Sequence, residues 1–112
     1  MKYKKIAPVT KEKAESILAS DSSIDQVKEA LLGAALNEKN DWKWLQDLCI
    51  KYSKHSDKSV QGAAILCFGH IARVHGHLEK DVVLPIIHNA QKDKETSSRA
   101  NDALDDINVF LS

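Results

Sequence analysis

Histidine is the residue type in this chain with the most versatile chemistry, because imidazole binds metal ions and moves protons near neutral pH. His70, His75 and His77 lie close together in a sequence of 112 residues. On one helix, however, His70 and His75 would be about 140° apart. His77 would follow Gly76, a residue typical of the left-handed end of a helix. The three rings are therefore not expected to converge on a metal, and hydrogen bonding at a helix end is the expected role.

Cys67 and His70 have the spacing at which a thiolate–imidazole pair could form on one helix. Cys67 and Cys49 are both surrounded by apolar residues, where a thiol packs as a small hydrophobic group. We favour core packing for both cysteines over the redox or nucleophilic alternative. The chain also lacks a Gly-rich phosphate loop and a nucleophile elbow. We therefore predict no catalytic residue, no metal and no cofactor.

The element that carries Cys67 and His70 is predicted as one long central helix over residues 56–76. Ser56 is its expected N-cap, Asp57 lies in its first turn, and Gly76 ends it. The segment is apolar or small almost all the way round, which indicates a helix covered on several sides.

The faces of this central helix follow from a rotation of about 100° per residue. One face is apolar and consists of Val60, Ala64, Cys67, Ile71 and Val74. Gly62 and Gly69 fall on the opposite face, where a neighbouring backbone could approach closely. Each glycine costs roughly 1 kcal/mol relative to Ala in a helix, so packing must offset them.

Five further segments have apolar residues at helical spacing. They cover about residues 11–20, 24–37, 42–54, 79–92 and 95–111. Thr10 and Ser23 are predicted N-caps, and Pro85 is expected to kink or restart the fifth helix. No segment alternates as a strand would, so the predicted class is all-α. Residues 1–9 form a basic leader segment, expected as a strand or loose tail.

Composition suits one compact domain over residues 1–112, since 43% of the residues are hydrophobic. Lys plus Arg and Asp plus Glu both number 16, so the formal net charge is zero. No global field favours nucleic acid or an anionic membrane. The chain has no signal-peptide pattern and no stretch of about 20 apolar residues, so we expect a cytoplasmic protein.

The second, fourth and sixth predicted helices align with one another at an offset of 36 residues. The matching positions include Ile24, Val60 and Thr96; Leu31, Cys67 and Ala103; Leu32, Phe68 and Leu104; and Ala35, Ile71 and Ile107. Such a period predicts three helix pairs stacked in a short right-handed α-solenoid.

The residues of this repeat resemble a known family, the HEAT repeats, over residues 42–111. One set of residues resembles the second helix of a HEAT repeat: Val60, Ala64, Cys67, Phe68, Gly69 and Ile71, with Asp57 in the preceding turn. Another set resembles the second helix of the next repeat: Asp93, Ala100, Ala103, Leu104 and Ile107. The usual Val-Arg pair is replaced by Val60-Gln61 in one repeat and by Thr96-Ser97 in the other.

The run CFGHIARVHG, followed by a Pro-containing helix and by ALDDINVFL, is similar to a group of small bacterial HEAT-like proteins. The group includes immunity proteins of contact-dependent growth inhibition and related polymorphic toxin systems. The resemblance implies a protein encoded beside a toxin, usually a nuclease, which it neutralises by binding near the active site. By the same resemblance the toxin could be a ribonuclease that attacks transfer RNA.

The last predicted helix has an acidic face opposite its apolar stripe. That face consists of Glu95, Ser98, Asp102, Asp105, Asp106 and either Asn108 or Val109, with Arg99 as the only basic residue. A solvated surface is the alternative interpretation. Yet Asp is a weak helix former, and anions near a helix C-terminus are disfavoured by roughly 0.3–1 kcal/mol. In a HEAT-like stack this helix lines the concave surface, so the resemblance implies that the acidic face continues across Arg73.

We therefore predict a binding protein that occludes a basic toxin through the acidic face and Arg73. Two alternatives stay open at the level of the sequence. One is a general HEAT-like scaffold or adaptor that presents the same face to another protein. The other is a HEAT-like enzyme or nucleic-acid-binding domain, which the neutral charge and the missing catalytic groups disfavour.

Overall fold

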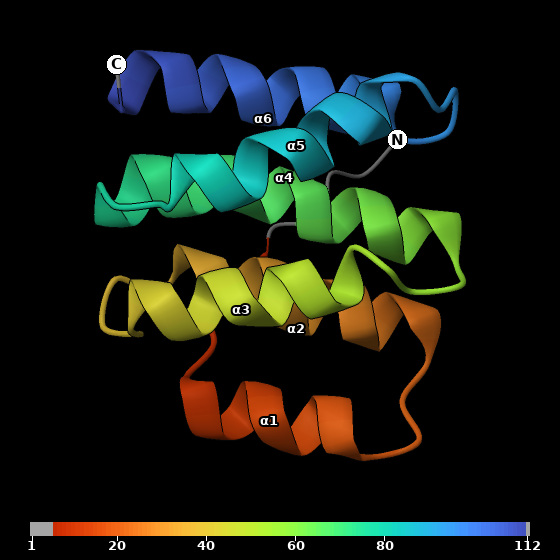
Figure 1. Ribbon diagram of the computed structural model, residues 1–112. Helices are drawn as coiled ribbons and strands as arrows, with labels where there is room; N and C mark the ends of the chain where they lie inside the picture. The colour runs from red at the N-terminus through yellow and green to blue at the C-terminus, as the bar shows by residue number, and fades with distance from the viewer. Residues whose placement is uncertain (1–5, 112) are drawn as a thin grey trace.

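The computed structural model describes residues 6–111 as a stack of six helices (Figure 1). They are α1 (Lys11–Ala19), α2 (Ile24–Leu36), α3 (Trp42–Tyr52), α4 (Lys58–His75), α5 (Lys80–Gln91) and α6 (Ser97–Phe110). No strand occurs among the described residues, and the all-α class is confirmed. Residues 1–5 of the predicted leader segment lie outside the described part, whereas residues 6–10 are non-helical.

The first two helices begin at the predicted capping residues. The Thr10 side chain accepts a hydrogen bond from the backbone N–H of Lys13. Ser23 and Gln26 form a complete capping box, in which each side chain accepts a hydrogen bond from the other residue's backbone N–H. Local sequence therefore fixes these helix starts without help from tertiary contacts.

The start of α4 differs from the prediction by one residue. Asp57, and not Ser56, is the N-cap, and its carboxylate accepts hydrogen bonds from the N–H groups of Ser59 and Val60. A carboxylate accepts two such bonds more readily than a hydroxyl and also suits the positive end of the helix dipole. Gly76 ends the helix in the left-handed conformation, with φ of 70°, as predicted.

The last two helices correct the sequence prediction in detail. α5 continues through Pro85 as one helix, so the predicted restart does not occur. α6 begins at Ser97, and Glu95 lies in the preceding turn instead of on the helix. The turn is held by the buried Thr96, whose hydroxyl donates to the carbonyl of Ala90 at 2.8 Å.

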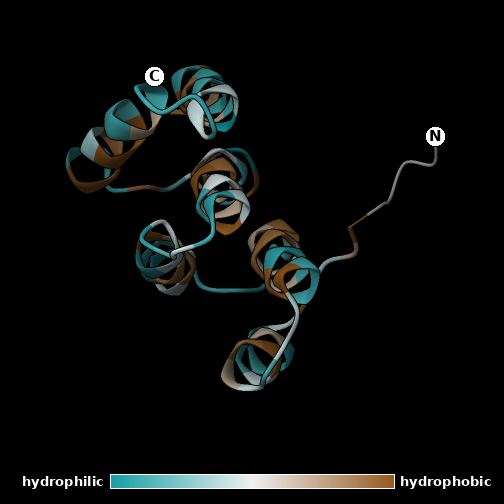
Figure 2. Cartoon of the chain, turned by 90° about the vertical axis from the view of Figure 1, so that its right-hand side faces the viewer, coloured by the Kyte–Doolittle hydropathy of each residue, from teal (hydrophilic) through white to brown (hydrophobic). Residues whose placement is uncertain are grey.

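The helices form two rows, which Figure 2 shows nearly end-on. In the inner row, α4 packs against α2 on one side and α6 on the other. The outer row contains α1, α3 and α5, which pack mainly against α2, α4 and α6 respectively. Within the described chain, no pair among α1, α3 and α5 packs as closely as α2 with α4 or α4 with α6. This arrangement is compatible with a short solenoid of three helix pairs, whose right-handedness stays a prediction.

The centre of the core lies around α4, as its composition predicted. Val60, Ala64, Cys67 and Ile71 are buried, and Val74 is partly buried. A Cβ atom on Gly69 would lie 3.0 Å from the Cα of Ala103, so α4 and α6 do meet backbone to backbone there. At Gly62 the expectation was wrong, because its nearest neighbour is the side chain of Arg99.

Two polar side chains fix the connections between helices. The Asn40 amide donates to the carbonyl of Val9, and its oxygen accepts from the N–H of Lys11. The fully buried Gln46 forms two hydrogen bonds of 2.7 Å with Glu79. Its amide nitrogen donates to the Glu79 carboxylate, and its amide oxygen accepts from the Glu79 backbone N–H. Since each buried polar group is paired, both residues tie loops to the stack without leaving unsatisfied groups.

The six-helix stack has nearly equal dimensions in all three directions, with principal extents of 33 × 30 × 29 Å. None of the described helices has the length and apolar character that crossing a bilayer requires.

Candidate interaction surface

The acidic residues of α6 lie on its outward side. Asp102 and Asp105 are exposed, whereas Asp106, further round the helix, is half-buried. The opposite side packs into the core through Ala100, Ala103 and Ile107. Ser98 is exposed on the first turn of α6, and Glu95 is exposed in the turn before it. We call Asp102, Asp105 and Asp106 the α6 acidic triad.

Most other acidic side chains of the second half have a structural role. Asp57 caps α4, and hydrogen bonds from Ser59 and Val60 lower the pKa of its carboxyl. Asp93 pairs with the ammonium of Lys58, which lowers the pKa of the Asp93 carboxyl.

Glu79 provides a further example of an acid with a structural role. It accepts hydrogen bonds from Lys43 and Gln46, which lower the pKa of its carboxyl. The α6 acidic triad, in contrast, makes no hydrogen bond or ion pair within residues 6–111. The one interaction of these carboxylates within residues 6–111 is the electrostatic influence of Asp106 on His70.

The helix α6 also lacks the charges and the cap that would stabilise its own dipole. Its first turn contains no acid, and its last turn contains no base. Its N-cap, Thr96, makes no capping hydrogen bond from its side chain. In α4, by comparison, Asp57 caps the start and Arg73 and His75 occupy the last turn. Each of these features costs a few tenths to about 1 kcal/mol, so α6 is not arranged for its own stability.

The structure brings Arg73 and Asp106 to the same imidazole ring. A guanidinium nitrogen of Arg73 donates to Nδ1 of His70 at 3.1 Å. Burial lowers the pKa of His70, the guanidinium groups of Arg73 and Arg99 lower it further, and the Asp106 carboxylate raises it. Arg73 is exposed and forms no ion pair with Asp106 in the described structure.

The acidic surface does not continue over α4, in contrast to the expectation from the HEAT resemblance. Residues 58–78 contain no acid, and Arg73, an exposed cation of α4, acts on the same His70 ring as Asp106. Further along the inner row, a hollow across α2, α4 and α6 is lined by both signs of charge, including Lys28, Glu29 and Arg99. Arg73 therefore borders the α6 acidic triad as an opposite charge instead of extending it.

The sequence analysis placed Val109 on the outward face of α6 only as an alternative to Asn108, and it missed Phe110. Val109 is 69% exposed and Phe110 is 47% exposed. Phe110 comes four residues after Asp106, so helical spacing already placed it on the same side as that carboxylate. That spacing was the available signal, because the apolar stripe is completed by Ile107 and Leu111 without Phe110.

The histidines and cysteines that could do chemistry are used for packing and hydrogen bonding. His75 forms the expected helix-end hydrogen bond, but to α2, through Nε2 and the carbonyl of Ala35 at 3.1 Å. His77 stacks on Trp42 with ring centroids 5.6 Å apart. No group of three or more potential metal ligands occurs among the described residues.

Cys67 is completely buried against Cys49, and both thiols are free. Its hydrogen bond with Cys49 and its burial hold the pKa of the Cys67 thiol well above the ordinary value. The thiolate that the proposed pairing with His70 would need is therefore disfavoured, and core packing explains both cysteines.

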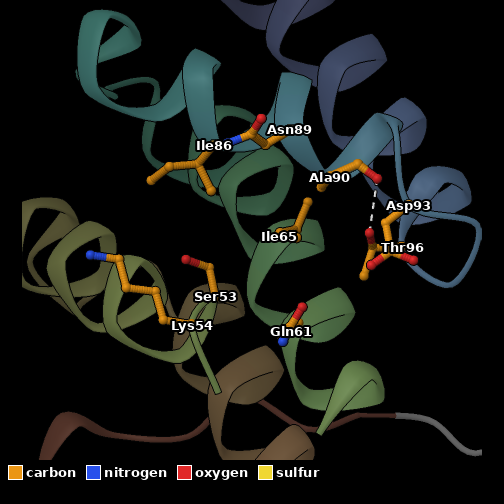
Figure 3. Close-up of a pocket in the computed structure, with 9 residues that line it drawn as sticks. All are labelled: Ser53, Lys54, Gln61, Ile65, Ile86, Asn89, Ala90, Asp93 and Thr96. Atoms are coloured by element: carbon orange, nitrogen blue, oxygen red, sulfur yellow. Dashed lines mark hydrogen bonds between the residues drawn. The ribbon is translucent and has the colours of Figure 1, made fainter. Parts of the chain in front are cut away.

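A hollow of about 250 Å³ lies on the outer side, where α4 is left uncovered between α3 and α5 (Figure 3). Its apolar floor and wall are formed by Ile65 and Ile86. The polar groups around it are largely engaged, as the bond from Thr96 to Ala90 illustrates (Figure 3). The hollow is below the usual size of a ligand pocket, about 300–1,000 Å³, and contains no convergent set of free polar groups.

No protein family and no curated protein matches the sequence. In three dimensions the chain is similar to a chain in the crystal structure of a CDI complex from Cupriavidus taiwanensis LMG 19424. The TM-score is 0.85 and the sequence identity 26%, over 100% of this chain and 99% of that chain. The resemblance to a component of such a complex, inferred from the sequence, is thereby confirmed along the whole chain.

Proposed function

We propose that this chain is an immunity protein of a contact-dependent growth inhibition system, which binds and neutralises a cognate toxin. The observation that carries the proposal is the full-length similarity, at a TM-score of 0.85, to a chain of a CDI complex. The similarity extends over 100% of this chain and 99% of that chain, so it is not confined to a single helix pair.

Neutralisation is proposed to occur by occlusion of the toxin's active or substrate-binding site. The partner surface comprises Glu95, Ser98, Asp102, Asp105, Asp106 and Arg73. The toxin is proposed to be a nuclease, with a ribonuclease that cleaves transfer RNA as the specific candidate. A nuclease binds the phosphate backbone through basic residues. The carboxylates of the α6 acidic triad, which form no ion pair within residues 6–111, are complementary to such a surface. By covering it, the chain would exclude the nucleic acid.

If the proposal holds, the neighbouring gene encodes a large secreted protein with a toxic C-terminal domain, and the direct test uses that domain, here called the cognate toxin domain. Its cleavage of total RNA and of transfer RNA is measured while this chain is titrated in. We expect cleavage to stop near one equivalent. Cleavage that persists at a large excess of the folded chain would refute neutralisation by direct binding.

The position of the partner surface is tested by charge reversal. Replacement of Asp102, Asp105 and Asp106 by Lys should leave the fold intact, because cations suit the C-terminal half of a helix. Association with a basic toxin domain should slow and depend less on salt, and any desolvated ion pair would lose roughly 2–5 kcal/mol. Surface plasmon resonance at two ionic strengths measures both effects.

A matched control makes the same change of net charge elsewhere. Glu15, Asp21 and Glu38 are exposed and lie in the N-terminal half of the chain. Their replacement by Lys should change association far less than the α6 substitutions do. If both triple variants bind alike, the effect is one of net charge and the interface lies elsewhere, for example near Trp44, whose ring is covered by the ammonium of Lys11.

A further inference from the structure

We infer that Val109 and Phe110 form the anchor of the partner interface and insert into an apolar pocket on the toxin that is rimmed by Lys or Arg. This inference rests on the proposed function and names the chemistry that the partner surface must have. Its starting point is the exposure of the two side chains, 69% for Val109 and 47% for Phe110.

The last turn of α6 is unusual within this molecule. Two other large hydrophobic residues of the described chain are exposed, Ile24 at 39% and Val82 at 45%, and each occurs singly on a different helix. Single exposed hydrophobic residues are ordinary on protein surfaces, whereas an adjacent pair that includes an aromatic ring is typical of an interface centre. Ile107 and Leu111 already close the core at this end, so Phe110 is not needed there.

The surroundings of the pair determine what can cover it. Asp105 and Asp106 precede it in the same two turns, and neither carboxylate is neutralised within residues 6–111. An apolar centre with a charged rim has the anatomy of protein–protein interfaces. The pocket that receives Phe110 must therefore be bordered by cations, as expected of a nuclease surface.

The same charges argue against two other occupants. A second copy of this chain docked through the same turn would bring two α6 acidic triads together, which like-charge repulsion disfavours. An anionic bilayer would be repelled by the same carboxylates. A basic protein satisfies both the apolar pair and its rim.

The test compares two double variants by isothermal titration calorimetry against the cognate toxin domain. Val109→Ala with Phe110→Ala should weaken binding by about 30-fold or more, the range of interface hot spots. The matched control, Ile24→Ala with Val82→Ala, removes the other two exposed hydrophobic side chains and should change binding by less than about threefold. Circular dichroism melting establishes that both variants are folded.

Each outcome bears on a different claim. Equal binding by wild type and the Val109/Phe110 variant would overturn the anchor while leaving the proposed function intact. No binding by the wild-type chain would overturn the proposed function and the anchor with it. Light scattering of the wild type alone gives the third outcome: a dimer that the double variant abolishes would reassign the pair to self-association.

Discussion

At the scale of single residues, His70 is the titratable group whose surroundings are most informative. It is half-buried on α4, accepts a hydrogen bond from Arg73, and faces Arg99 and Asp106 on α6. Three influences lower its pKa and only the Asp106 carboxylate raises it. The ring is therefore a local reporter of the junction between the α6 acidic triad and the cations of the inner row.

The titration of His70 gives the first prediction. Its pKa, followed by NMR, should lie below the ordinary histidine value and should fall further in Asp106→Asn, which removes the favourable carboxylate. Since the folded pKa is depressed, the unfolded chain binds the proton more readily, and stability should fall as the pH drops below the ordinary pKa. His70→Gln should remove part of that fall. A pKa at or above the ordinary value would contradict the geometry described.

At the scale of elements, the sequence predicted where the helices lie along the chain, but only partly which segments pack against each helix face. Apolar periodicity and capping residues predicted six helices with ends within one or two residues of those observed. Periodicity gives an angle around a helix but not the partner at that angle. For this reason Gly69 and Gly62 had the same prediction, whereas only Gly69 faces a backbone.

This difference between the two glycines gives the second prediction. Gly62→Ala should raise the free energy of unfolding by about 0.5–1 kcal/mol, because the new methyl group meets only the Arg99 side chain, at 3.4 Å. Gly69→Ala should lower it by about 1–3 kcal/mol, since its methyl group would press on the Ala103 backbone. Urea unfolding of both variants tests the contact between α4 and α6. Two variants of equal stability would show that the helices are not packed as described.

The third prediction concerns the core position on α4. Phe68 is completely buried, so Phe68→Ala should cost about 3–5 kcal/mol. Phe110→Ala removes the same group from a position that is 47% exposed and should cost less than about 1 kcal/mol. Thermal unfolding of the pair measures the contrast. Similar losses in both variants would mean that the last turn of α6 supports the fold instead of the interface.

At the scale of the whole molecule, the sequence predicted the class and the pairing of helices but not the contacts between distant segments. The stacking of His77 on Trp42 and the bonds of Gln46 with Glu79 join residues 33 or more positions apart. No periodic pattern contains such information. The sequence predicted the exposed Ser98, Asp102 and Asp105 on α6, but it placed Glu95 on the helix instead of in the turn before it. The border with Arg73 and His70 depended on how α6 lies against α4.

The exposure of Val109 and Phe110 likewise depends on which helices pack against α6. Among the described residues α6 packs against α4 and α5, whereas α4 packs against α2, α3, α5 and α6. A helix face that no other helix covers needs polar residues for solubility. The α6 acidic triad supplies this polarity, and the adjacent apolar pair departs from it, which is the whole-molecule argument for a partner at this end.

The measurement that most directly tests the account is growth of cells in which the cognate toxin domain is induced. Cells that also produce the wild-type chain should grow as well as uninduced cells, as should cells with Lys at positions 15, 21 and 38. Cells with Lys at positions 102, 105 and 106 should stop growing, although that variant is folded. Growth arrest in the presence of the wild-type chain would contradict the assignment as an immunity protein. Full protection by the variant with Lys at 102, 105 and 106 would contradict the placement of the interface on α6.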